Sequence, residues 1–176
     1  MIAYTTMESV VGPLLLAGDE RGLLRVSFGT ISVGGGKKEQ FPKAGWTEDA
    51  APFGELMRQL RAYFAGELQT FDVPLVLEGT DFQVRVWQAL RSIPYGETIS
   101  YLELAKRIGN AKAVRAVGLA NGANPIPILV PCHRVIGSNG SLTGFGGGIE
   151  NKAQLLALES RQLGLQWKPG KFSVTA

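Results

Sequence analysis

The sequence predicts an α+β fold of two domains, a small β-sheet with one helix followed by a helical domain. Runs typical of strands occupy the first third of the chain, and patterns of helical spacing follow. A segment that contains Pro74 and Gly79 separates the two parts. We therefore expect domains at residues 1–72 and 81–176, joined by a linker at 73–80, within the size that 176 residues allow.

Three short runs in the N-terminal part are typical of β-strands. Ile2–Thr6 comes first, and Leu14–Ala17 and Leu23–Phe28 follow, joined by a turn-forming segment at 18–22 that predicts a hairpin. Residues 29–51 are polar and irregular, with a cluster of glycines. We interpret them as a mobile surface loop.

Two helices are predicted next. Phe53–Phe64 has apolar residues at helical spacing, and Gly66 suits its end; we attribute this face to core packing and assign it no chemistry. The second helix begins after Thr80 or Asp81, either of which can cap it, and stops before Pro94, which disfavours helical geometry at the preceding residue. Its predicted buried face comprises Phe82, Val86, Trp87 and Leu90.

A helix-turn-helix follows. Ser100 begins a Ser-x-x-Glu capping box, and the helix that it opens, Tyr101–Ile108, closes at Gly109. We expect Asn110 to cap a second helix at once, over residues 111–120. This motif binds DNA in many proteins, although the same arrangement also occurs as plain packing.

Small residues dominate the second of these helices, whose only long polar side chains are Lys112 and Arg115. A surface of small residues lets the backbone approach a narrow groove, where Arg115 could enter the base stack in place of an extruded nucleotide. For Ala116 and Gly118, tight packing inside the domain explains the composition equally well.

Charge divides unevenly along the chain. Residues 1–80 hold 7 Lys and Arg against 10 Asp and Glu, whereas residues 81–176 hold 11 against 5. No carboxylate lies between Glu103 and Glu150. Such a stretch suits a polyanion such as DNA, and a solvated basic face explains it as well.

The chain has one cysteine, Cys132, and one histidine, His133, which are neighbours in the segment Pro-Cys-His-Arg-Val. A single cysteine forms no intramolecular disulfide, and one Cys with one His is too few for a structural zinc site. A lone cysteine is more often a buried apolar residue than a reactive one. Here the adjacent imidazole and guanidinium can lower the pKa of the thiol or take its proton, so we favour a reactive thiolate.

The segment before the cysteine is rigid and specific. Three prolines, the last of them Pro131, exclude a regular helix and restrict the backbone angles ahead of the cysteine. A nucleophile that must attack in one geometry needs such a rigid backbone. Asn-Pro-x-Pro and Pro-Cys-His-Arg-Val, preceded by a small-residue helix-turn-helix, resemble the O6-alkylguanine-DNA alkyltransferases. The resemblance runs from about residue 82 to residue 163, is weaker over the N-terminal third, and includes in order Tyr101, Arg115, Asn124 and Glu159.

The resemblance implies a ribonuclease H-like N-terminal domain, a winged-helix-like helix-turn-helix, and transfer of an alkyl group from guanine O6 in double-stranded DNA to Cys132. His133 would remove the thiol proton through a water, and Glu159 would orient the imidazole. Asn124 would brace the nucleophile segment as a hinge. Tyr101 would donate to guanine N3 and crowd the 3′ phosphate.

It also implies a minor-groove interface from which the damaged guanine is flipped into a pocket. Arg115 would fill the gap in the duplex, and further DNA contacts would come from Tyr101, Lys112, Ala113, Ala116 and Gly118. The residues implied to form the pocket are Pro127, Val135, Phe145 and Gly146. The carbonyls of Cys132 and Val135 would face the guanine amino group, and the Gly146 amide would face O6.

The implied product is a thioether that no second cysteine resolves, so the protein would act once per molecule and need no cofactor. The chain lacks the N-terminal zinc ligands of some members, so no metal is expected. Activity on O4-alkylthymine and cooperative binding of the expected monomers to DNA stay open. No apolar run reaches the length of a membrane span and no secretory signal is present, so we expect a cytoplasmic protein, associated with the nucleoid if it is prokaryotic.

Several features depart from the family or stay ambiguous. Gly146 replaces a serine of some members, in a glycine-rich stretch that we interpret as a mobile and roomy pocket wall. Cys132 argues against the non-catalytic alkyltransferase-like proteins, which usually have tryptophan there. A helix-turn-helix regulator with an incidental cysteine and a papain-type hydrolase each explain fewer of the features. Lys152 either supports the site wall or forms a surface salt bridge, and Arg134 either contacts phosphate or braces the domains.

Overall fold

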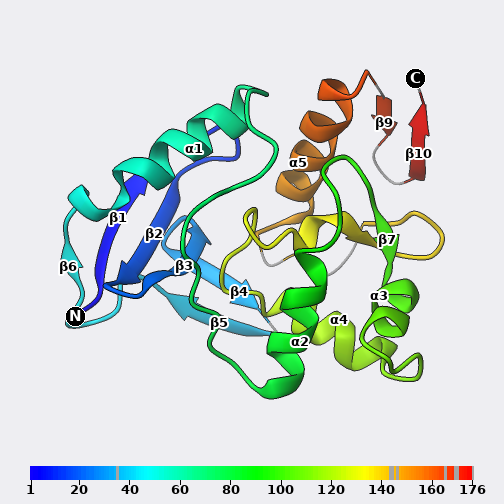
Figure 1. Ribbon diagram of the computed structural model, residues 1–176, viewed down its shortest axis with the longest axis horizontal. Coiled ribbons are helices and arrows are strands. Elements are labelled where there is room, and N and C mark those ends of the chain that lie inside the picture. The colour runs from blue at the N-terminus through cyan, green and yellow to red at the C-terminus, as the bar shows by residue number, and fades with distance from the viewer. Residues whose placement is uncertain (35, 143–144, 146, 165, 169–170, 176) are drawn as a thin grey trace.

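The computed structural model describes residues 1–34, 36–142, 145, 147–164, 166–168 and 171–175. A sheet and helix α1 (Gly54–Phe64) form one side of the molecule, and helices α2 to α5 form the other (Figure 1). This is the two-domain α+β arrangement that the sequence predicts.

The N-terminal sheet has four strands in the order β3-β2-β1-β6. These are β1 (Ala3–Met7), β2 (Leu14–Asp19), β3 (Gly22–Phe28) and β6 (Thr47–Glu48). Strands β1, β2 and β3 pair antiparallel as the three predicted runs imply, and β6 joins β1 in parallel.

Strand β2 is buried on both faces, which explains its nearly continuous apolar sequence. Leu14 and Leu16 belong to the main core under α1, whereas Leu15 packs with Phe41 in a smaller cluster on the opposite face. The sheet is thus covered on one side by a helix and on the other by the chain that returns from β5.

The prediction of an irregular loop over residues 29–51 is wrong. Strands β4 (Ile31–Gly34) and β5 (Lys37–Gln40) form an antiparallel hairpin, and β6 follows. The hairpin escaped detection because its side chains are mostly exposed on both faces, so no buried face imposes an apolar pattern. Its strands are held by backbone hydrogen bonds, which the side-chain sequence does not report.

Helix α1 follows a 3-10 turn (Ala51–Phe53) and ends before Gly66, whose positive φ closes the helix as predicted. Helix α2 (Asp81–Leu90) begins at a complete capping box, in which the Thr80 side chain accepts from the Gln83 amide. The predicted helices at 53–64 and after residue 80 are therefore confirmed.

The remaining elements surround the Cys132 segment. They are β7 (Ile99–Ser100), α3 (Tyr101–Arg107), α4 (Val114–Gly122), a 3-10 turn (Cys132–Arg134), β8 (Val135–Ile136), α5 (Ile149–Gln162), β9 (Gln166–Lys168) and β10 (Lys171–Thr175). Strands β7 and β8 pair in parallel, and β9 and β10 form a terminal hairpin.

The helix-turn-helix differs from the prediction at its second helix, which begins at Val114 rather than at residue 111. Gly109 and Asn110 donate their amides back to the carbonyls of Lys106 and Ala105, in the pattern of a Schellman motif that ends α3. Asn110 therefore closes the first helix and does not cap the next. Lys112 and Ala113 consequently lie in the turn between the helices.

The predicted capping box of α3 is half formed. The Ser100 hydroxyl accepts from the Glu103 amide at 3.0 Å, as a helix cap does. The Glu103 carboxylate instead contacts Arg107 at 3.3 Å, one turn further along the helix. The Glu103 carboxylate thus serves the helix surface and leaves the cap to Ser100.

The two halves of the chain share one core. Apolar residues of α1 and of the sheet cluster with residues of α2, α4 and α5. The Val26 amide donates to the Pro125 carbonyl, and Leu23 exchanges hydrogen bonds with residues 74 and 76 of the predicted linker. In the part of the chain that the structure describes, no helix is long and apolar enough to cross a membrane.

Candidate active site

Cys132 lies at the start of a short 3-10 turn, at the base of a cavity between the two halves of the chain. Its side chain is 4% exposed. The cavity walls come from both halves, and among the lining residues are Phe28, Val33, Asn121, Asn124, Pro127 and Phe145. A group that reacts with the Cys132 sulfur must therefore enter the cavity.

Asn124 holds the loop that leads to the cysteine. Its amide nitrogen donates to the Val130 carbonyl at 2.7 Å, and its amide oxygen accepts from the Ile126 amide at 2.9 Å. Both ends of the proline-rich loop are therefore fixed to one side chain. Ile128, at the tip of this loop, has a φ of 76° and is buried.

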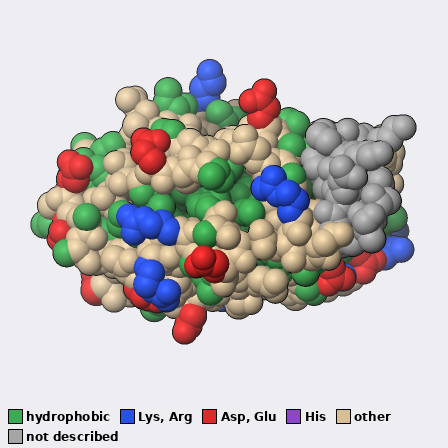
Figure 2. Space-filling model, turned by 90° about the horizontal axis from the view of Figure 1, so that it is seen from above, with side chains coloured by type: hydrophobic (Ala, Val, Ile, Leu, Met, Phe, Trp, Pro, Cys, Tyr) green, Lys and Arg blue, Asp and Glu red, His purple; other side chains and the backbone are tan. Residues whose placement is uncertain are grey.

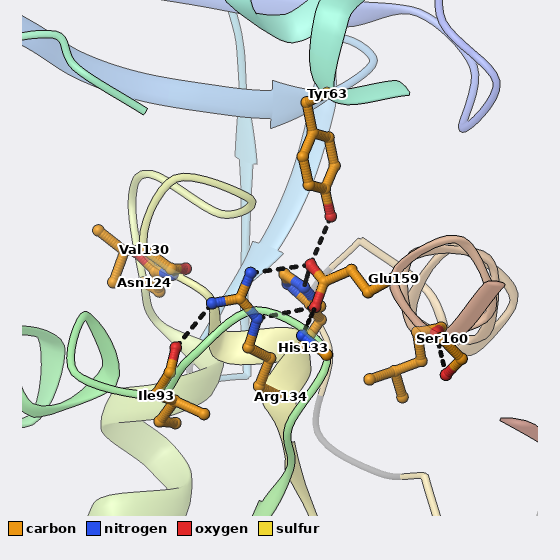
Figure 3. A network of polar contacts seen from close by, with 10 residues as sticks. Tyr63, Ile93, Asn124, Val130, His133, Arg134, Glu159 and Ser160 are labelled. Carbon is orange, nitrogen blue, oxygen red and sulfur yellow. Dashed lines mark hydrogen bonds and ion pairs between the residues drawn. The ribbon is translucent and has the colours of Figure 1, made fainter. Parts of the chain in front are cut away.

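Glu159 of helix α5 is the centre of a buried polar network, drawn in Figure 3. Its Oε2 lies 2.7 Å from His133 Nε2 and accepts from the Tyr63 hydroxyl at 2.6 Å. The backbone amide of Gly96 donates to Oε1 at 3.2 Å. Donors from three separate segments of the chain thus converge on one carboxylate, which is 1% exposed.

Arg134 belongs to the same network. Its Nε and Nη2 donate to the two oxygens of Glu159 at 2.8 and 2.9 Å, and its Nη1 donates to the Ile93 carbonyl at 2.7 Å. The side chain is 9% exposed. Its burial disfavours the phosphate contact, and its two partners, Glu159 and Ile93, both lie in residues 81–176, so Arg134 braces that part of the chain rather than the two domains.

Burial raises the pKa of the Cys132 thiol to about 11, against the opposing effects of Asn124 and of the Lys152 charge. The expectation that the neighbouring groups lower the pKa of the thiol is therefore wrong, and the alternative, that one of them takes its proton, stays a prediction. The reason is geometric: the neighbouring guanidinium of Arg134 binds Glu159, so burial outweighs the charges that act on the sulfur. The thiol is neutral at neutral pH and needs a base.

The adjacent imidazole of His133 is the candidate for that base. Burial lowers its pKa below the usual value despite the opposing effect of Glu159, so the ring is neutral at neutral pH. Burial by itself raises the pKa of Glu159, but His133 and Arg134 reverse that effect and keep it ionised. The ionised carboxylate requires a proton on Nε2, which leaves Nδ1 as the basic nitrogen. Nδ1 is buried and has no hydrogen-bond partner among the described residues.

Lys152 of helix α5 lies near enough to the cysteine for its charge to act on the thiol. It is fully buried, and its ammonium donates to the Val135 carbonyl at 2.6 Å. Burial lowers its pKa to about 8, partly offset by Cys132. Lys152 therefore supports the wall of the site, and the alternative of a surface salt bridge is excluded.

The helix-turn-helix presents a basic and largely small-residue surface. Lys106, Arg107, Lys112 and Arg115 are exposed, and the long side chain of Leu119 is 59% exposed on α4. Ala116 is exposed too, so core packing does not explain it. By contrast, the face in Figure 2 mixes charges of both signs around apolar side chains.

Two family models match the chain along most of its length. The 6-O-methylguanine DNA methyltransferase ribonuclease-like domain matches residues 2–77, and the DNA-binding domain of the same family matches residues 81–161. The chain belongs to the 6-O-methylguanine DNA methyltransferase family. The resemblance seen in the sequence is thereby confirmed.

Individual members of the family are similar over nearly their whole length. A methylated-DNA–protein-cysteine methyltransferase of Methanosarcina acetivorans is 58% identical over 89% of this chain and 97% of its own. The crystal structure of Mycobacterium tuberculosis O6-methylguanine methyltransferase is 52% identical, with a TM-score of 0.82, and covers 92% of this chain and 94% of its own. A structure of Mycobacterium tuberculosis OGT in complex with DNA has a TM-score of 0.83 at 52% identity, over 91% and 94% of the two chains.

The structure brings together most of the residues that the family resemblance assigns to catalysis. Cys132, His133, Glu159 and Asn124 form one connected site, whereas Tyr101 lies at the N-terminus of α3 with its ring 5.9 Å from the Lys152 ammonium. Gly118 lies close to the same ring, since a methyl group added to it would be 3.8 Å from the Tyr101 side chain.

The expected pocket residues are found in three situations. Pro127 and Phe145 line the cavity, and Phe145 packs edge-on against Phe28 with ring centroids 5.4 Å apart. The Val135 side chain is fully buried, and its carbonyl accepts from Lys152. Gly146 lies outside the described residues, and so does the prediction that its glycine-rich stretch forms a mobile and roomy pocket wall.

Two residues that contact the site were missed in the sequence analysis. Tyr63 belongs to the first predicted helix, which we assigned to core packing, and its hydroxyl function appears only once α5 is placed beside it. The Asn121 amide donates to the Cys132 carbonyl at 3.4 Å from within a helix of small residues. A buried polar residue in an apolar helix face is the only signal that either position offered.

Proposed function

We propose that this protein repairs O6-alkylguanine in double-stranded DNA by transferring the alkyl group to Cys132, once per molecule. One observation carries the proposal: the only thiol of the chain adjoins a buried His133–Glu159 pair at the base of a cavity. The activity is the one for which the relatives are named, methylated-DNA–protein-cysteine methyltransferase.

The chemistry follows from the protonation states of the site. His133 Nδ1 takes the thiol proton through a water, and the imidazolium that forms is stabilised by the Glu159 carboxylate. The sulfur attacks the alkyl carbon, an S–C bond forms, and the C–O6 bond breaks with its electron pair on the guanine. Tyr101 donates a proton toward guanine N3 as that charge develops, and the proton taken from the thiol restores it. The product is a thioether at Cys132 and an unmodified guanine.

The burial of the thiol requires that the base leave the duplex. A cysteine that is 4% exposed does not reach a base inside the helix stack, so the guanine is flipped into the cavity. We assign the minor-groove contact to the helix-turn-helix, with Arg115 in the vacated position and Lys112 beside the phosphates. Ala113, Ala116 and Gly118 allow close approach of the backbone.

The protein is proposed to act as a monomer in the cytoplasm, and without a cofactor. Among the described residues no group of three or more His, Cys, Asp or Glu side chains is arranged to hold a metal ion. The proposed chemistry needs none, since the acceptor, the base and the carboxylate belong to the chain.

Intact mass spectrometry tests the proposal. The protein is incubated with a duplex that contains one O6-methylguanine, and we expect a mass gain of one methylene, located on Cys132, that stops at one equivalent of DNA. Cys132→Ser is the matched control and should bind the duplex without gaining mass. Tight binding with no mass change would favour a helix-turn-helix regulator, and repeated turnover would favour a hydrolase.

A further inference from the structure

Tyr63 is the residue through which the N-terminal domain contacts the catalytic network. Among the described residues, no other side chain of residues 1–72 forms a hydrogen bond to Glu159 or His133. We propose that Tyr63 is a positioning residue for the alkyl transfer, because its hydroxyl fixes the carboxylate that orients the base. The inference rests on the proposed transfer to Cys132.

The geometry leaves the Glu159 carboxylate little freedom. Oε2 receives the Tyr63 hydroxyl at 2.6 Å, His133 Nε2 at 2.7 Å and Arg134 Nη2 at 2.9 Å. In Figure 3 the tyrosine reaches the carboxylate from above and Arg134 from the side, so its hydrogen bond opposes rotation of the carboxylate toward the other donors. The oxygen that orients His133 is therefore the one that Tyr63 holds.

Packing explains the ring of Tyr63 but not its hydroxyl. The ring is fully buried and contacts Phe64, Phe71 and Tyr95 at centroid distances of 5.4, 5.3 and 6.2 Å. A phenylalanine would make the same contacts. Burial first, and then the charge of Glu159, raise the pKa of Tyr63 well above its usual value, so the hydroxyl remains a neutral donor throughout the working pH range.

The hydroxyl also affects the charge that His133 experiences. The charged groups that act on this pair are Arg134, near both Glu159 and His133, and Lys152, near His133. The Tyr63 and Tyr95 hydroxyls lie near Glu159 as neutral groups, and of the two only that of Tyr63 donates a hydrogen bond to the carboxylate among the described residues. Without the Tyr63 donor, the negative charge on Oε2 is less compensated. The imidazolium is then favoured, so His133 holds its proton up to a higher pH and is unavailable as a base below it.

Tyr63→Phe tests the role directly. We measure the rate of Cys132 methylation by an O6-methylguanine duplex at saturating DNA across pH, and the titration of the single imidazole by NMR. We expect the plateau rate to fall about ten-fold, the value of one hydrogen bond to a charged group. The acidic limb and the imidazole titration should both move up by about one pH unit, with the affinity for the duplex unchanged.

Tyr95→Phe is the matched control. Its hydroxyl is buried in the same neighbourhood but has no hydrogen-bond partner among the described residues. We expect its pH profile to coincide with that of the unmodified protein. A Tyr63→Phe profile that coincides as well, or an equal shift in Tyr95→Phe, would overturn the positioning role.

A second variant tests the same role if the Tyr63→Phe protein does not fold. 3-Fluorotyrosine at position 63 keeps the hydrogen bond and makes the hydroxyl a stronger donor, so the acidic limb should move to lower pH. An unchanged limb refutes the inference. If the unmodified protein is never methylated at Cys132, the proposed function fails instead, and the NMR titration alone decides whether Tyr63 acts on His133.

Discussion

Ile128 offers a test of how the loop before the nucleophile is held. It is the one non-glycine residue with a positive φ in the described part of the chain, at 76°, and its side chain is 2% exposed. The left-handed conformation costs a residue with a Cβ atom about 1–2 kcal/mol. Burial of the side chain and the Val130 amide donating to the Ile126 carbonyl at 2.9 Å hold the residue there.

The order of stability of two variants reports this strain. Ile128→Ala and Ile128→Gly both lose the buried side chain, at about 2–5 kcal/mol for the alanine. Glycine adopts the left-handed conformation without this cost, but its greater freedom in the unfolded chain lowers the free energy of unfolding by about 0.5–1 kcal/mol. Ile128→Gly should therefore be more stable than Ile128→Ala by about 0.5–1 kcal/mol.

Leu129 supplies the matched control, because it is also buried and its φ is not positive. There the order should reverse, with Leu129→Ala more stable than Leu129→Gly by about 0.5–1 kcal/mol. Urea unfolding followed by circular dichroism measures all four free energies. If alanine is the more stable substitution at both positions, the strain argument is refuted.

Two further predictions concern buried charges. Arg134→Met should lower the free energy of unfolding by about 3–5 kcal/mol in urea denaturation, because Glu159 loses its bidentate partner. Arg107→Met, which removes an exposed pair with Glu103, should change the free energy of unfolding by less than about 1 kcal/mol, and equal effects of the two variants would contradict this account. Burial lowers the pKa of Lys152 from its ordinary value of 10.5 to about 8 in the folded state. Between pH 8 and 10.5 the unfolded chain therefore binds more protons than the folded protein, and raising the pH favours the folded state. The protein should thus gain about 3 kcal/mol over Lys152→Met across that window, measured by urea unfolding at several pH values, and a pH-independent difference would disprove it.

The parts of the fold that the sequence predicted are those in which burial imposes a pattern. Strands β1 to β3 and helices α1 and α2 each have a buried face, and turn or cap residues mark their ends. The β4–β5 hairpin and the start of α4 were missed for the converse reason. Exposed strands are held by backbone hydrogen bonds, and the end of α3 depends on a Schellman motif that competes with capping by Asn110.

The candidate catalytic segment could be singled out from the sequence because its residues are neighbours in the chain. Cys132 and His133 are adjacent, and the prolines stand just before them. What the sequence could not show is the protonation state, because it depends on burial and on where Arg134 points. Tyr63 lies 96 positions from Glu159, so no local pattern connects them. Contacts between distant segments of this kind appear only when the helices are placed in space.

The neutral state of the resting thiol suits a protein that uses its nucleophile once. With a pKa of about 11 for Cys132, on the order of one thiol in ten thousand is ionised at pH 7. The thiolate is the form that reacts with electrophiles and oxidants in solution, and the 4% exposure of the side chain further restricts their access. In the proposed mechanism, the sulfur becomes nucleophilic only by passing its proton to His133 while a bound group faces it. The same burial that raises the thiol pKa lowers that of the imidazole, so both partners are neutral at rest and the proton transfer between them waits for the base that enters the cavity.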